Sequence, residues 1–175
     1  MPTFSLVAHP DHPPLAVRAV EVEVLGSTDD VQLTYLVAGV EKVVFPALAT
    51  PIRADELWRT TCFELFLGFD DEERYVEFNF SPSTRWAAYA FDGYREGMAP
   101  LDRDVAPHVE WRAYGVDVDC DLGGLLHGEL RMALSAVIEE EGGVRSFWAL
   151  AHPPGAPDFH HPACFAARLP APACP

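Results

Sequence analysis

Four side chains in the middle of the sequence have the chemistry of a surface that binds a small polar molecule. Glu64 and Glu77 supply carboxylates, Asn79 supplies an amide and Trp86 supplies an indole ring. Carboxylates and amides exchange hydrogen bonds with hydroxyl groups, and an aromatic ring stacks on the C–H face of a sugar. These residue types suit a carbohydrate or a small polar metabolite, provided that the fold places them on one surface.

The elements that must position these residues are strands, because apolar and polar side chains alternate here with a period of two. Cys62–Gly68 and Arg74–Ser81 are predicted strands joined by a turn over the acidic run 70–73. We expect their apolar sets to be opposed, because a shift of one residue would expose all of them. The expected pairs are Phe63 with Phe80, Leu65 with Phe78 and Leu67 with Val76.

This register puts the polar residues on the second face of the hairpin. Glu64 then lies opposite Asn79, and Phe66 lies opposite Glu77. The same alternation is typical of the solvated side of an antiparallel sheet. The pattern alone therefore leaves a purely structural polar face as an alternative to a binding surface.

The strand that follows the hairpin is expected to extend this face. A tight connection over 81–84 would bring the chain back so that Trp86 lies beside Asn79. Tyr89 and Phe91 then have the parity of the apolar set and are expected in the core. Further rings and a donor from other segments are expected to join the binding face, namely Trp58, Tyr94, Arg95 and Trp148.

The rest of the chain shows the same period-two pattern, interrupted by Gly, Pro and Asp clusters. Many short strands of this kind are typical of a sandwich or jelly roll, whereas a parallel sheet needs helices between its strands. The sequence therefore predicts an all-β fold, an antiparallel and jelly-roll-like β-sandwich. The other predicted strands are Phe4–Ala8, Val17–Leu25, Val31–Val37, Trp86–Phe91, Val109–Asp119, Gly128–Leu134, Arg145–His152 and Phe165–Leu169, with helical turns near Asp55–Trp58 and Ser135–Glu140.

Length and charge limit the class of protein. The 175 residues suit a single domain over 1–175, in which the proline-bearing loop 93–108 is long enough to be functional and the tail 170–175 is expected to fray. The 27 acidic and 12 basic residues give a formal net charge of −15, which disfavours nucleic acid and anionic membranes as partners.

The sequence also bears on the compartment. No stretch of 18 apolar residues and no basic, apolar leader is visible, so a soluble, cytoplasmic protein is expected.

The four cysteines are widely spaced and lack a CxxC pair, which predicts free thiols rather than disulfides or a zinc site. They are Cys62, Cys120, Cys164 and Cys174.

Five motifs run through the chain: LWRTTCFELFL (57–67), YVEFNFSP (75–82), WAAY (86–89), WALAHP (148–153) and PDFH (157–160). With them, the stretch from about residue 15 to residue 169 resembles the DOMON-like proteins related to family-nine carbohydrate-binding modules. The resemblance implies a jelly-roll-like sandwich that binds a ligand, and it does not imply catalysis. It implies sugar as the ligand, as in the carbohydrate-binding modules, or haem, as in the cytochrome members of the DOMON group. Its hairpin motif points to Glu64, Glu77 and Asn79 as polar contacts.

Residues with metal-binding chemistry gather in one loop near the C-terminus. Imidazole, carboxylate and thiol groups are all metal ligands, so a zinc or copper site is one interpretation. The spacing matches no standard zinc pattern, and the prolines of this loop favour a rigid, hydrogen-bonded structure over a metal site. The residues are His152, Asp158, His160, His161 and Cys164.

Haem and calcium are the other cofactors to consider. The cytochrome members of the resembling group bind haem through a methionine and a histidine, which makes Met98 with His152 or His160 the candidate pair here. Met132 alternates with core leucines and is expected to pack in the core. The related carbohydrate-binding modules can carry a structural calcium, although no EF-hand-like spacing is present.

We therefore expect a noncatalytic module that binds a carbohydrate or carbohydrate-like small molecule on a sheet face. The alternatives are a haem- or metal-binding DOMON-type domain and a protein interaction module without a small ligand. Glu64 and Glu77 as a glycosidase acid and base, or Asp158 with His160 as a proton-transfer pair, would make the protein an enzyme. Catalysis is not expected, because no catalytic motif accompanies either pair.

Overall fold

Strands dominate the computed structural model, which describes residues 1–123, 125 and 128–172. Residues 173–175 of the tail that was expected to fray, Cys174 among them, lie outside the described residues. Three short 3-10 turns accompany the strands: η1 (Val40–Lys42), η2 (Leu57–Arg59) and η3 (Pro162–Cys164). The strands are β1 (Thr3–Ala8), β2 (Ala19–Gly26), β3 (Asp30–Ala38), β4 (Cys62–Gly68), β5 (Tyr75–Phe80), β6 (Trp86–Phe91), β7 (Ala99–Pro100), β8 (His108–Arg112), β9 (Gly115–Asp121), β10 (Leu130–Glu140), β11 (Val144–Ala149) and β12 (Ala167–Leu169).

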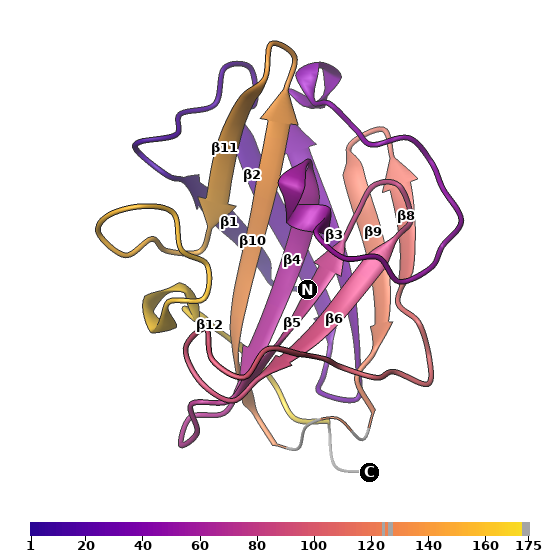
Figure 1. Ribbon diagram of the computed structural model, residues 1–175, viewed down its shortest axis with the longest axis vertical. Helices are drawn as coiled ribbons and strands as arrows, with labels where there is room; N and C mark the ends of the chain where they lie inside the picture. Colours follow the sequence, from indigo (N-terminus) through magenta and orange to yellow (C-terminus); the bar gives the residue numbers. More distant parts are fainter. Residues whose placement is uncertain (124, 126–127, 173–175) are drawn as a thin grey trace.

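The strands form two layers that are joined through β1. The first half of β1 pairs with β2, and Val7 and Ala8 pair with β11. One layer has the order β1-β2-β3-β9-β8, and the other has the order β11-β10-β4-β5-β6-β7, with β12 paired to β10. Figure 1 shows the second layer in front of the first. All these pairings are antiparallel, which confirms the predicted all-β antiparallel sandwich.

The core lies between the two layers. Alternate residues of β2, β3 and β9 meet alternate residues of β4, β5 and β10, and most of these side chains are completely buried. Burying one large apolar side chain stabilises a fold by roughly 1.5–3 kcal/mol, so this face supplies most of the driving force. Tyr35 of β3 crosses the core and donates its hydroxyl to the carbonyl oxygen of Glu64 at 2.7 Å, which links the layers.

The β4–β5 hairpin has the predicted register. Phe63 pairs with Phe80, and Glu64 pairs with Asn79. The apolar set of both strands therefore faces the core, and the polar set faces away from the opposite layer, as the alternation indicated.

The predicted register of β6 is wrong by one residue, since Ala87 rather than Trp86 pairs with Asn79. The connection between β5 and β6 has one residue more than expected. It closes with a hydrogen bond from the Ser81 amide to the Arg85 carbonyl at 2.9 Å, and Thr84 adopts a left-handed φ of 77°. The shift reverses the faces of β6. Trp86 packs in the core, whereas the expected core residues Tyr89 and Phe91 lie on the outer face.

Two further predictions of local structure are wrong. Ser135–Glu140 is part of β10 rather than a helical turn, because this segment is hydrogen-bonded to β4 on one side and to β11 on the other. Val109–Asp119 is a hairpin of β8 and β9 rather than one strand. Gly115 opens β9 with a φ of 147°, and a Cβ there would lie 2.0 Å from the carbonyl oxygen of Tyr35. The turn expected at Asp55–Trp58 is η2, shifted by up to two residues.

None of the helical segments in the described part of the chain has the length and apolarity that a membrane-spanning helix needs. Of the expected free thiols, Cys62, Cys120 and Cys164 are indeed free, and all three are buried.

A buried carboxylate at the end of β10 fixes the approach to β2. Glu140 is 1% exposed, and its two oxygens accept the amide N–H groups of Leu15, Ala16 and Val17 at 2.8, 2.5 and 3.1 Å. Hydrogen bonds to a charged acceptor are stronger than neutral ones, so one side chain here holds three consecutive amides.

Replacing this carboxylate tests its contribution. We expect Glu140→Gln to lower the free energy of unfolding by about 2–3 kcal/mol, because one acceptor oxygen and the charge are lost from a buried site. Urea unfolding measures the change, with the exposed Glu141→Gln as a control that should cost less than about 1 kcal/mol. Equal stability of the two variants would show that Glu140 does not anchor this segment.

Candidate functional site

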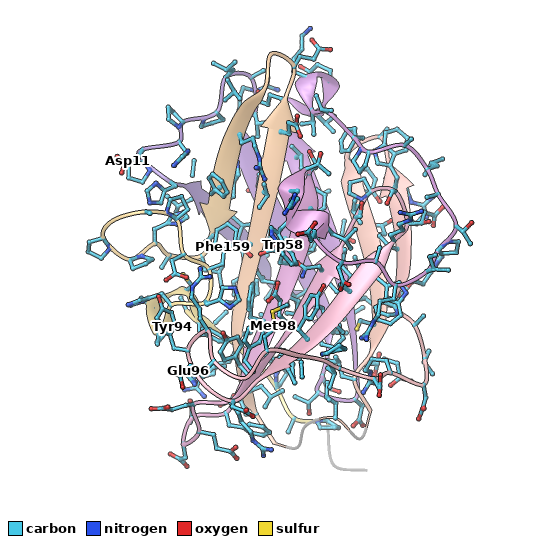
Figure 2. All side chains as sticks on the ribbon, viewed as in Figure 1. Asp11, Trp58, Tyr94, Glu96, Met98 and Phe159 are labelled. Atoms are coloured by element: carbon cyan, nitrogen blue, oxygen red, sulfur yellow. The ribbon has the colours of Figure 1, made fainter. Side chains whose placement is uncertain are left out.

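A cavity of about 440 Å³ lies on the outer face of the layer that contains β4, β5 and β10. Three segments stand over this face: η2, the loop 92–98 and the C-terminal segment 157–160 (Figure 1). Figure 2 places Trp58 and Met98 in front of this layer and Phe159 at its β11 side. The residues that line the cavity are Trp58, Glu64, Glu77, Phe91, Arg95, Met98, Val137, Arg145, Phe147, Pro157, Phe159 and His160.

Glu64 and Glu77 form the floor of the cavity. They are 3% and 4% exposed. Ser135 donates its hydroxyl to Glu64 Oε2 at 2.8 Å, and the Asn79 side-chain amide donates to Glu77 Oε1 at 2.7 Å. Each carboxyl group is therefore oriented by one neutral donor from the sheet.

The two carboxyl groups have raised pKa values. Burial, and then the nearby charge of Glu77, raise the pKa of Glu64 to about 8, although the hydrogen bond from Ser135 opposes this. Burial likewise raises the pKa of Glu77 to about 7, against the hydrogen bond from Asn79 and the charge of Arg95. Two acids in a poorly solvated site resist losing both protons, so the pair retains a proton near neutral pH.

His160 covers one side of this floor. Its ring lies between Phe66 and Phe91, with centroid distances of 5.2 and 5.1 Å. Nδ1 lies 2.8 Å from the hydroxyl of Tyr75, and Nε2 lies 3.8 Å from Glu77 Oε2. Burial, followed by the charge of Arg95, lowers the pKa of His160 to about 4, so the imidazole is neutral at neutral pH.

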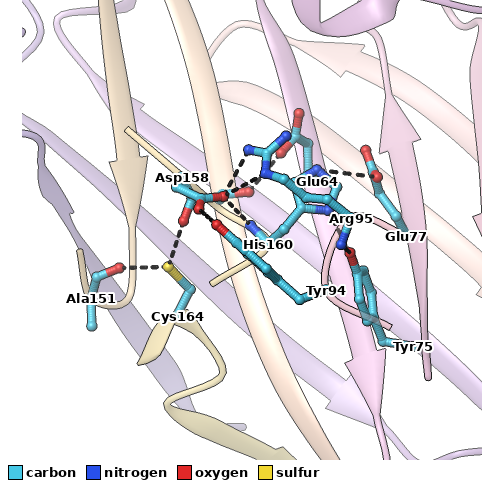
Figure 3. A network of polar contacts seen from close by, with 10 residues as sticks. Glu64, Tyr75, Glu77, Tyr94, Arg95, Ala151, Asp158, His160 and Cys164 are labelled. Carbon is cyan, nitrogen blue, oxygen red and sulfur yellow. Dashed lines mark hydrogen bonds and ion pairs between the residues drawn. The ribbon is translucent and has the colours of Figure 1, made fainter. Parts of the chain in front are cut away.

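The rim of the cavity is held by a polar cluster, which Figure 3 shows from close by. Asp158 accepts hydrogen bonds from Nη2 of Arg95 at 2.7 Å, from Nε of Arg95 at 3.2 Å and from the hydroxyl of Tyr94. Arg95 has a left-handed φ of 56°, and its own amide donates to the Tyr75 hydroxyl at 3.3 Å. These contacts tie the loop 92–98 to the C-terminal segment and to β5.

The walls are aromatic. Trp58 packs edge-on against Tyr89, and its carbonyl oxygen accepts Nη2 of Arg145 at 2.7 Å. The Arg145 guanidinium lies over the ring of Phe147, at 5.8 Å from its centroid. Phe147 in turn packs against Phe159 at 6.2 Å. The cavity therefore combines an acidic floor with two arginines and several aromatic rings.

The structure brings together some of the predicted binding residues and separates others. Glu64, Glu77, Trp58 and Arg95 line the cavity. Asn79 is completely buried and acts on the site by orienting Glu77, and Tyr94 acts through Asp158.

Trp86 and Trp148 do not lie on this face, contrary to the prediction. Both pack in the core between the layers. Trp86 is turned inward by the extra residue before β6, which pairs it with Phe80. Trp148 pairs with Ala8 and Ala136, on strands whose apolar parity points inward at these positions.

Several cavity residues were not predicted. Arg145 and Phe147 have the opposite parity to Trp148 along β11. The period of two therefore places them on the opposite face from Trp148, which is the signal that could have predicted them. Phe91 was assigned to the core because of the register error in β6. Phe159 and Pro157 lie outside any strand, where the sequence pattern holds no such signal.

The residues with metal-binding chemistry make polar contacts with different parts of the protein. His152 Nε2 lies 2.8 Å from the carbonyl oxygen of Val7, and His161 Nδ1 accepts the amide of Ala163 at 3.1 Å. Burial, then the charge of Asp158, raise the pKa of the Cys164 thiol to about 11. In the described part of the chain, no three His, Cys, Asp or Glu side chains are arranged to hold a metal ion.

The residues present do not fit haem. Met98 and His160 line the same cavity, whereas His152 does not, and Met132 packs in the core. The nitrogens of His160 already face protein oxygens, Nδ1 at the Tyr75 hydroxyl and Nε2 at Glu77. The imidazole therefore does not direct a lone pair into the cavity as an axial ligand must.

The fold resembles a solved structure from Bacteroides uniformis, described as a "putative carbohydrate-binding protein". The two chains are 16% identical, the likeness covers 97% of this chain and 85% of that chain, and the TM-score is 0.67. At this identity the likeness shows a shared fold alone. No protein-family model matches the chain, and a search of curated proteins finds no significant match.

The raised pKa values predict how stability depends on pH. Because Glu64 and Glu77 bind protons more tightly in the folded protein, the stability they contribute is present at low pH. It is lost as pH rises through about 7 and 8. Urea unfolding between about pH 6.5 and about pH 8.5 should therefore show a decreasing free energy of unfolding. The lowered pKa of His160 affects the free energy of unfolding at pH values below this range.

The double variant Glu64→Gln/Glu77→Gln should remove most of this decrease, whereas exposed Glu21→Gln/Glu141→Gln should retain it. The same slope in both double variants would contradict the raised pKa values.

Proposed function

We propose that the protein is a noncatalytic binding module that holds a carbohydrate or carbohydrate-like small molecule in the cavity above Glu64 and Glu77. One observation carries the proposal: acceptors, guanidinium donors and aromatic rings converge on one concave site. Its volume lies within the range of roughly 300–1,000 Å³ that small-molecule sites occupy.

Each side of the cavity suits a different part of such a ligand. The carboxyl groups of the floor exchange hydrogen bonds with hydroxyl groups, and Arg95 and Arg145 donate to ring or hydroxyl oxygens. Trp58, which lines the cavity, offers an aromatic ring for the C–H groups of a sugar. The resemblance of the hairpin motifs to the DOMON-like proteins related to family-nine modules supports this proposal. The likeness to the Bacteroides uniformis protein supports it as well.

Trp58 provides a direct test, because it is the tryptophan that lines the cavity. We expect a sugar from a panel of monosaccharides and disaccharides to change the tryptophan fluorescence and to raise the melting temperature. Trp58→Ala should weaken binding about tenfold, since an aromatic contact contributes about 1 kcal/mol beyond its buried area. Trp111→Phe is the control, because Trp111 is exposed on β8 in the other layer.

Two results would overturn the proposal. If no sugar changes fluorescence or melting temperature, the module does not bind a carbohydrate. If the protein hydrolyses a chromogenic glycoside and Glu64→Gln abolishes that activity, the carboxyl pair is an acid and base, and the noncatalytic assignment is wrong.

A further inference from the structure

The floor of the cavity lacks a positive charge of its own. Among the residues that the structure describes, no lysine or arginine nitrogen lies within 4.0 Å of Glu64 or Glu77. The nearest basic group is His160, which is neutral near pH 7 and lies 3.8 Å from Glu77. Buried carboxylates are normally paired with a cation, because an unpaired buried charge is costly.

Both arginines of the cavity are held elsewhere. The charge of Arg95 is matched by Asp158, through two hydrogen bonds. Arg145 donates to the carbonyl oxygen of Trp58 and stacks on Phe147. The charge of Arg95 acts on Glu77 from beyond ion-pair distance, and neither guanidinium forms an ion pair with the floor.

The open acceptors are geometrically available to a ligand. Ser135 and Asn79 engage one oxygen of each carboxyl group, Glu64 Oε2 and Glu77 Oε1. Glu64 and Glu77 both line the cavity, which leaves Glu64 Oε1 and Glu77 Oε2 for a ligand. Glu77 Oε2 also lies 3.8 Å from His160 Nε2, which is beyond hydrogen-bond distance. An ammonium group has three donors and a positive charge, which suits two neighbouring carboxylates.

The walls favour a cation as well. Trp58, Phe91, Phe147 and Phe159 stand around the acidic floor. The negative face of an aromatic ring attracts a cation, and rings combined with a carboxylate are a recurrent way to bind ammonium groups. The net charge of −15 further raises the local concentration of cations near the protein.

We infer that the ligand carries a protonated amino group that binds between Glu64 and Glu77, which makes an amino sugar the preferred class of carbohydrate. This inference rests on the proposed function. The amino group lies at the floor, and the hydroxyl groups of the ligand point to Arg95 and Arg145. The raised pKa values of the two glutamates agree with it, because a cation that is absent from the free protein would be needed to ionise both.

The test compares matched sugars by isothermal titration calorimetry at about pH 7, where the two carboxyl groups begin to ionise. The probes are glucose, glucosamine and N-acetylglucosamine, and galactose with galactosamine. We expect an amino sugar to bind at least about tenfold more tightly than its parent sugar and than the N-acetyl derivative, whose amide is neutral. Glu77→Gln should reduce this preference to about twofold or less, whereas exposed Glu21→Gln should retain it.

The outcomes separate this inference from the proposed function. Equal affinity for parent and amino sugars in the wild type would overturn the inference and leave carbohydrate binding intact. A preference for the amino sugar that survives in both Glu64→Gln and Glu77→Gln would also overturn it. If none of the sugars binds, both proposals fail. Urea unfolding of the two variants confirms that they are folded, since removing an ionisable buried carboxyl is expected to stabilise the protein above neutral pH.

Discussion

Two buried carboxyl groups without a cationic partner are the constraint on which the candidate site depends. Glu64 and Glu77 are carried to the outer face of their layer by the same register that sends Phe63 and Phe80 into the core. A one-residue change of register would turn the core side chains to the outer face, so the two glutamates cannot change face without disrupting the core. The cost of burying them is reduced by retained protons and by one neutral donor each, rather than by an ion pair.

The segments that bury this pair are attached to the sheet by polar contacts. Asp158 joins the C-terminal segment to Arg95 in the loop 92–98, and His160 joins it to Tyr75 on β5. These contacts stand at the rim, so they close the face without filling the space above Glu64 and Glu77. The result is a sheet face that is covered at its edges and hollow above its carboxyl groups. This arrangement distinguishes the face from the solvated side of an ordinary antiparallel sheet.

The sequence predicts the parts of the fold that depend on local alternation. The β4–β5 hairpin has strong apolar parity on both strands and a short acidic turn, so its register and the shared face of Glu64, Asn79 and Glu77 were predictable. The strand after it was not, because Thr84 takes a left-handed conformation that glycine or asparagine would normally signal. That one residue reversed the faces of Trp86 and Phe91.

The loop residues of the site were harder to predict for a different reason. Arg95, Phe159 and His160 reach the cavity only through contacts between segments far apart in the chain, and no period links them to the hairpin. Tertiary pairing also overrode local preference at 135–140, where neighbours on both sides turned an expected helical turn into a strand. Residue type indicated Arg95 as a donor and His160 as a chemically capable side chain, but it did not show that both would meet on one cavity.

Glu64 and Glu77 are expected to share protons near neutral pH as a pair that lines the cavity. Carbon-13 NMR of the glutamate carboxyl groups across a pH titration tests this claim most directly, with Glu64→Gln and Glu77→Gln assigning the two signals. Both signals should titrate above the ordinary glutamate pKa, near 7 to 8, and a bound amino sugar should move both titrations to lower pH. Two signals that titrate at the ordinary value, with no response to any ligand, would contradict it.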